Sequence, residues 1–255
     1  DAAIGGWIED LAEEPLFSSW RGARWHKTPL GPGTHAWIVR VRAAEGGETL
    51  GYLIVAAKPE GGYVLLEYGP GEFGPFSEAV LAAARREGEI ETDRLEWFYY
   101  DPLHAFWKMT GPSEPAFIDA VTGARLPVRE ETVEALEPWL PGADAEDPDF
   151  GLVAGERFHL EPAAPDPYMD LAWLDARDAA AADWSEWLAW FGGREKAGVY
   201  AGAAYGRELL VPFGVAGYHW WTASDGALQR FVALDQEGLT RFVPLAPLLL
   251  HGAFR

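Results

Sequence analysis

The pattern of apolar residues predicts antiparallel strands near the N-terminus. Three apolar runs follow one another, separated by turns that contain Gly or Pro, and they begin at His35, Leu50 and Tyr63 (HAWIVRVR, LGYLIVAA and YVLLEYG). The second run is almost continuously apolar, as in a strand that is buried on both faces. Runs of this length at this spacing are typical of an antiparallel meander.

A helix and further strands are predicted after this meander. Phe76, Val80, Leu81 and Ala84 stand at helical spacing, and Ser77 is suited to cap the helix. The apolar runs RLEWFYY, AFWKMTG and PAFIDAVTGARLPV follow. Strands, one helix and strands again predict a sheet with a helix on one face, which is an α+β arrangement.

The last of these runs contains a predicted hairpin turn. In FIDAVTGARLPV, Asp119 can accept hydrogen bonds from backbone amides two or three residues further on, and Thr122–Gly123 suits a tight turn. Gly123 adopts a positive φ without steric cost. The pattern therefore assigns Asp119 a structural role and not a catalytic one.

The remainder of the chain divides into a helical part and a second meander. The strongest helix pattern lies in 169–193, with apolar residues at Trp184, Trp187 and Phe191 and a break expected near 179–182. The runs RELLVPFGVAGYHWWT, LQRFVALD and TRFVPL then predict adjacent strands, followed by a short helix or an apolar tail.

These patterns predict an α+β protein in three parts. The first is an α+β module over 1–128, the second an acidic, Pro-containing helical connector over 129–195, and the third an antiparallel β-meander over 196–255. Whether the two β-rich parts share one core stays open at this point.

Charge supports the middle part as distinct and restricts the choice of partner. The net charge is −20, and residues 130–186 alone contain 16 acids against two arginines. Phosphate backbones would be repelled, which disfavours nucleic acid as a partner. No apolar run reaches the ~18 residues of a membrane span.

Cysteine is absent, which excludes disulfides and thiolate chemistry. The chain begins at Asp1 without a basic segment followed by an apolar one. We expect a secreted or cell-surface protein whose signal peptide is removed or lies outside this chain. Thirteen Trp residues are expected mainly in the core, the alternative being exposed aromatic platforms.

The strand runs and the Asp119–Gly123 piece carry a resemblance. Over Trp20 to Val128, the G-Y-aliphatic run and the terminal F-I-D-A-V-T-G resemble the PepSY and streptopain-type prodomain group of secreted bacterial proteins. The resemblance implies a small cystatin-like sheet with a helix, and an inhibitory or accessory role outside the cell. No peptidase cysteine accompanies it in this chain.

Candidate metal ligands are few. No two of the six His residues have the spacing of a zinc motif. An acidic loop offers alternate carboxylates for calcium, although Pro148 interrupts it and the usual Gly and final Glu are missing. The alternatives are a solvated acidic linker and a calcium site, whose ligands would be Asp144, Glu146, Asp147 and Asp149.

The segment GYHWWT, residues 217–222, is the candidate binding segment. In a strand, Tyr218 and Trp220 point to one face, and His219 and Trp221 to the other. An exposed face would offer Tyr218, Trp220 and Trp221 as a stacking surface for sugar or peptide. A second interpretation is an inactive peptidase-like remnant, with His219 beside a G-Y pair and no nucleophile.

The sequence contains no nucleophile elbow and no phosphate-binding loop. We therefore expect a protein that is not an enzyme and has no cofactor, the alternative being calcium bound at the acidic loop. The predicted function is binding or modulating another protein outside the cell, such as a secreted peptidase. The alternative is a cell-wall or carbohydrate-binding module that uses exposed aromatic side chains.

Overall fold

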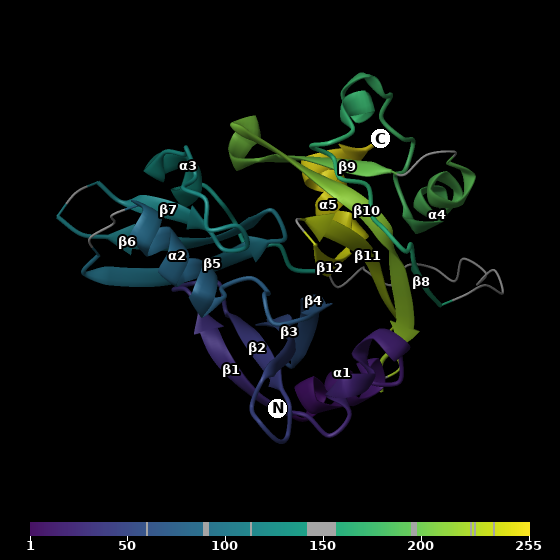
Figure 1. Ribbon diagram of the computed structural model, residues 1–255, viewed down its shortest axis with the longest axis horizontal. Helices are drawn as coiled ribbons and strands as arrows, with labels where there is room; N and C mark the ends of the chain where they lie inside the picture. Colours follow the sequence, from purple (N-terminus) through teal and green to yellow (C-terminus); the bar gives the residue numbers. More distant parts are fainter. Residues whose placement is uncertain are drawn as a thin grey trace.

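The computed structural model contains helices and two antiparallel sheets, in agreement with the predicted α+β class. Figure 1 shows the smaller sheet at the left of the view and the C-terminal strands at the right. Among the described residues, no helix is long and apolar enough to cross a membrane. The structure describes residues 1–59, 61–88, 92–112, 114–141, 157–194, 198–224, 226, 228–236 and 238–255.

The large sheet has ten strands in the described residues, and consecutive strands form its N-terminal half. Ile38 and Ile54 belong to one buried cluster and Val39 and Leu53 to another, because alternate residues of a strand point to opposite faces. The two middle strands that carry these residues are therefore largely buried on both faces, as the almost continuously apolar run from Leu50 predicts. The strands are β1 (Arg24–Leu30), β2 (Ala36–Arg42), β3 (Thr49–Ala57) and β4 (Tyr63–Pro70).

The C-terminal strands continue the same sheet in the order β12, β11, β10, β9 and β13, and β8 also pairs with β10. The β10–β11 and β11–β12 hairpins are those predicted from the repeated turn signals. The strands are β8 (Phe158–Leu160), β9 (Val199–Ala204), β10 (Leu209–Thr222), β11 (Leu228–Gln236), β12 (Leu239–Pro244) and β13 (Gly252–Phe254).

The two halves of the large sheet meet where β4 lies beside β12, with Tyr68 opposite Phe242. One buried cluster contains residues of both halves, and the rings of Tyr68 and Phe242 stack within it at 4.9 Å. The N-terminal and C-terminal β-rich parts thus share a core. The predicted boundaries at 128 and 195 stay predictions, and the sheet continues across them.

The smaller sheet consists of β5 (Arg94–Asp101), β6 (His104–Thr110) and β7 (Ala116–Asp119). The predicted hairpin turn follows β7. The Asp119 carboxylate accepts hydrogen bonds from the backbone N–H groups of Val121 at 3.0 Å and Thr122 at 2.7 Å. Gly123 has a φ of 74°. The structural role predicted for Asp119 is confirmed.

The helices cover the sheets and differ in part from the prediction. The break expected near 179–182 is present and is longer than predicted, since the whole segment 176–183 between η2 and α4 is not helical. The first of the two pieces is a short 3-10 turn and not an α-helix. Four strands were not predicted. β1 carries three basic residues and a proline, β9 consists mainly of Ala and Gly, and β8 and β13 have only three residues each. The helices and 3-10 turns are α1 (Ala2–Leu11), η1 (Pro15–Trp20), α2 (Glu78–Gly88), α3 (Glu130–Glu134), η2 (Leu171–Asp175), α4 (Trp184–Gly193), η3 (Tyr205–Arg207) and α5 (Leu245–His251).

Candidate functional site

Asp101 organises the tight connection between β5 and β6. Its Oδ1 accepts hydrogen bonds from the backbone N–H groups of Leu103 at 2.8 Å and His104 at 3.1 Å. Its Oδ2 lies 2.7 Å from Nδ1 of His104. An aspartate whose side chain accepts from amides two and three residues ahead stabilises a turn, so D-P-L-H folds locally around its own carboxylate.

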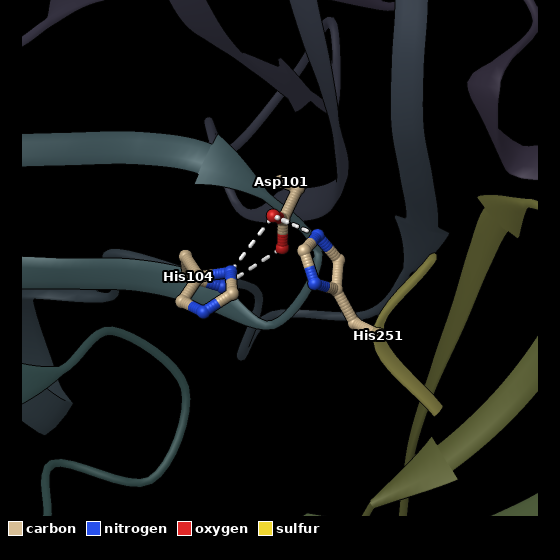
Figure 2. A group of neighbouring side chains, drawn as sticks. All are labelled: Asp101, His104 and His251. Carbon is tan, nitrogen blue, oxygen red and sulfur yellow. Dashed lines mark hydrogen bonds and ion pairs between the residues drawn. The ribbon is translucent and has the colours of Figure 1, made fainter. Parts of the chain in front are cut away.

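The end of α5 brings a second histidine to the same carboxylate. Nε2 of His251 lies 3.2 Å from Oδ2 of Asp101, and the two imidazole rings are 5.1 Å apart and nearly perpendicular. Asp101 and His104 are buried, whereas about a third of the His251 side chain is exposed. Figure 2 shows the carboxyl group of Asp101 between the two rings. We call these three residues the Asp101 cluster.

A strained turn contacts the buried side of this cluster. The backbone N–H of Tyr205 donates to Nε2 of His104 at 2.9 Å. Tyr205, Gly206 and Arg207 have φ values of 51°, 66° and 71°. Left-handed backbone costs a non-glycine residue roughly 1–2 kcal/mol, so the bond to His104 helps to hold an unfavourable conformation.

The hydrogen bonds assign the proton of His104. Nε2 accepts the Tyr205 N–H, so it carries the lone pair, and the proton lies on Nδ1 and is donated to Asp101. Neither ring nitrogen of His104 then has a lone pair available for a metal ion. The three side chains are close enough to form a metal site, but this bonding leaves only Asp101 and His251 as ligands. Two ligands are fewer than protein zinc sites provide.

The cluster shifts the proton affinities of its exposed and buried members. Burial alone would raise the pKa of Asp101, but the hydrogen bonds from His104 and His251 hold it well below its usual value. The hydrogen bond to Asp101 raises the pKa of His251, against a smaller opposing effect of burial. The cluster thus contains a carboxylate that stays ionised and an imidazole that binds its proton more tightly than usual.

The predicted binding segment 217–222 lies on β10, and its alternation is as predicted. Trp221 is only 4% exposed and belongs to the core shared by both halves of the sheet. Tyr218 is on the opposite face, where its ring packs 5.7 Å from that of Phe191 on α4. Trp220 is half-buried. The three rings therefore do not form one exposed platform, and a binding role for Tyr218 and Trp220 stays a prediction.

His219 is buried beside Trp221 and is not accessible as a surface base. Its Nδ1 lies 2.8 Å from the hydroxyl group of Tyr68, and its Nε2 is 3.7 Å from the Glu14 carboxylate. Burial lowers the pKa of His219 to about 3, helped by the charge of Arg157. Its neutral ring therefore belongs to the packing of the core.

Four exposed apolar side chains gather in one short segment around η2. Met169 is 84% exposed, Tyr168 60%, Leu171 55% and Leu174 50%. We call these four side chains the 168–174 surface. The segment is the green turn at the top of Figure 1, near the C-terminus. Single exposed apolar residues are ordinary, but a contiguous group of them is typical of an interaction site.

The backbone that carries the 168–174 surface is firmly held. Trp173 is buried against Val199 and Ala201 of β9, and its ring N–H donates to the carbonyl of Pro167 at 2.7 Å. The Asp170 carboxylate accepts from the N–H of Ala172 at 3.0 Å, which caps η2. A fixed backbone with apolar side chains directed outward is preorganised for binding.

The C-terminal residues connect the two regions. After His251, β13 pairs with β9, and the carbonyl of Phe254 accepts from the N–H of Ala179 at 2.7 Å. Arg255 donates to the Asp178 carboxylate at 2.8 Å. One short stretch of chain therefore contacts both the Asp101 cluster and the segment that follows the 168–174 surface.

Neither region was predicted from the sequence. Asp101 and His104 have the spacing of an aspartate-capped turn, a signal that a search for paired histidines overlooks. Met169 to Leu174 matched the helical pattern, although Pro165 and Pro167 shortly precede them. The predicted calcium ligands Asp144, Glu146, Asp147 and Asp149 lie outside the described residues.

The fold and these regions define a class only at the level of an α+β protein with an extended antiparallel sheet. No family model matches the chain. No curated protein and no solved structure is detectably similar to it. The resemblance to PepSY-like prodomains therefore stays a prediction.

Proposed function

We propose that this protein is a non-catalytic binding protein that docks another protein through the 168–174 surface. The observation that carries the proposal is the exposure of Tyr168, Met169, Leu171 and Leu174 on a backbone anchored by Trp173. A secreted location and a peptidase as the partner remain predictions from the sequence.

The energetics of this segment support a docking role. Apolar surface left in water costs roughly 25 cal/mol per Å², which burial under a partner would recover. Because the turn is already fixed by Trp173 and Asp170, little backbone entropy would be lost on binding. Exposed Met and Tyr side chains are also suited to such contacts, since both residue types are enriched at protein interfaces.

The carbohydrate-binding alternative has less support. It requires Trp220 and Trp221 to present stacked rings together, and Trp221 is buried. The peptidase-like remnant also has less support, because His219 is buried beneath aromatic side chains and faces Tyr68.

A general base at His251 is the second candidate function, favoured by its bond to Asp101. Donation from Nε2 to the carboxylate leaves Nδ1 as the proton acceptor, and the ring is partly exposed. Hydrolysis of p-nitrophenyl acetate that is lost in His251→Asn and kept in His35→Asn would favour this candidate. Equal rates in the two variants would exclude it for this class of ester.

Photo-crosslinking tests the binding function. A photoreactive amino acid is placed at Ala172, which is exposed within the 168–174 surface, and in a control chain at the exposed Ala44. We expect one protein from the secreted or cell-surface fraction to be captured from position 172 only. Its capture should be lost in the variant Met169→Ser/Leu174→Ser. Equal capture from both positions, or none, would contradict the proposal.

A further inference from the structure

Aspartates flank and alternate with the residues of the 168–174 surface along the chain. Asp166, Asp170, Asp175 and Asp178 lie within the same short stretch of chain and are all exposed, against a single base, Arg177. Asp178 is paired with Arg255, whereas Asp166, Asp170 and Asp175 form no ion pair within the part of the chain that the structure describes. The apolar side chains therefore stand in a region of negative potential.

This charge restricts what can cover the surface. A second copy of the chain would place like charges together across the contact, on a protein whose net charge is already −20. Anionic lipid and nucleic acid would be repelled in the same way. A protein surface with basic residues around an apolar depression would instead be attracted by the aspartates and would bury the apolar side chains.

We propose that the occupant of the 168–174 surface is a cationic protein surface, in which Lys or Arg side chains surround an apolar pocket. The proposal rests on the binding function proposed above and specifies the chemistry of the partner. Met169, the most exposed of the four side chains, is the group best placed to enter the pocket. The aspartates would accelerate association and exclude partners of the wrong charge.

Two of the aspartates also support the turn, which determines how they are to be tested. The carboxylate of Asp166 accepts from the N–H of Tyr168 at 2.9 Å, and that of Asp170 accepts from the N–H of Ala172 at 3.0 Å. Asparagine keeps an oxygen that accepts the same bonds and removes only the charge. The test variant is therefore Asp166→Asn/Asp170→Asn/Asp175→Asn.

The control variant removes three charges elsewhere. Glu45 and Glu48 are exposed in the turn between β2 and β3, and Glu87 is exposed on α2. The variant Glu45→Gln/Glu48→Gln/Glu87→Gln changes the net charge by the same amount. A second test variant, Met169→Ser/Leu174→Ser, removes apolar side chains without changing the charge. Unchanged circular dichroism and melting temperature would establish that each variant folds.

The probes are two fluorescent amphipathic peptides of the same length, one of Leu and Lys and one with Gln in place of Lys. We expect the Lys peptide to bind the protein and the Gln peptide to bind at least about tenfold more weakly. The aspartate variant should lose about tenfold in affinity for the Lys peptide, and the control variant less than about twofold. Raising the salt from about 0.05 to about 0.5 M should remove most of the difference between the peptides.

The outcomes separate this inference from the proposed function. If both peptides bind equally and Met169→Ser/Leu174→Ser abolishes binding, the surface binds apolar partners but the cationic partner is wrong. If the aspartate and control variants lose affinity equally, overall charge causes the binding and the inference is also wrong. If neither peptide binds, this inference fails, while crosslinking from position 172 still tests the binding function.

Discussion

Glu67 and Arg241, 174 positions apart in the chain, form a two-contact ion pair where β4 meets β12. Nε and one terminal nitrogen of Arg241 donate to the two carboxylate oxygens of Glu67 at 2.8 and 2.9 Å. Tyr52 and Tyr99 donate to the same oxygens, and Arg241 also donates to the carbonyl of Pro102. The pair joins both halves of the large sheet to the smaller sheet.

Removing one member of this pair should lower the free energy of unfolding. Arg241→Met leaves a fully buried carboxylate without its cation, which costs about 3–5 kcal/mol in comparable pairs. We expect a loss of this size in the free energy of unfolding, measured by urea titration. Arg21→Met, at the exposed pair with Glu13, is the matched control and should change it by less than about 0.5 kcal/mol. Equal effects would contradict the role of the buried pair.

His219 should make the protein sensitive to acid. Burial lowers its pKa to about 3 from 6.5, so between these values the unfolded chain binds a proton that the folded protein does not. The stability contribution is complete above pH 6.5 and is lost by about 1.4 kcal/mol per pH unit as the pH falls. His219→Asn should remove this slope from urea titrations at pH 4 to 7, and His35→Asn should keep it.

His251 should have the opposite dependence on pH. Its pKa is raised by Asp101, so the stabilisation is complete below the unfolded value of 6.5 and is lost as the pH rises through the folded value. The measurement is the rate of amide hydrogen exchange in β13, corrected for the intrinsic rate at each pH. We expect the ratio of this rate in the unsubstituted protein to the rate in the His251→Asn variant to increase as the pH rises from about 6 to about 9. The groups that face the imidazole are Asp101 and His104. A pH-independent ratio would contradict the prediction.

Two glycines should respond in opposite ways to alanine. Gly5 lies within α1 with open space around it, so Gly5→Ala should stabilise the protein by about 0.5–1 kcal/mol. A methyl group at Gly214 on β10 would collide with the carbonyl of Pro165, ahead of the 168–174 surface. Gly214→Ala should cost roughly 1–3 kcal/mol. Melting temperatures of the two variants provide the comparison.

The sequence predicts most strands because burial on a pleated sheet leaves a pattern in neighbouring residues. β3 is an almost continuous apolar run, β4 is interrupted only by Glu67 before its final Gly-Pro, and their bounds follow from the turns beside them. β1 was missed because it is half-exposed and contains Arg24, Lys27 and Pro29. β9 was missed because Ala and Gly fill positions where larger side chains would not fit, as at Gly202 against Leu103.

The candidate sites depend on contacts between distant parts of the chain. Asp101 and His104 are neighbours in sequence, but no local pattern predicts that His251, at the end of α5, lies beside them. Tyr168 and Met169 are exposed because β9 packs against their neighbour Trp173 and not against them. Local pattern favours a buried helix for such a run, and the anchoring of Trp173 decides otherwise.

The C-terminal strand connects a titratable histidine with the proposed binding surface. His251 contacts Asp101, and a few residues later Phe254 and Arg255 hold Ala179 and Asp178 beside the 168–174 surface. A partner that binds more tightly when this stretch is docked would also strengthen the contact of His251 with Asp101, and by reciprocity the pH would change the affinity for the partner. Binding should then be accompanied by proton uptake, whose heat varies with the ionisation enthalpy of the buffer.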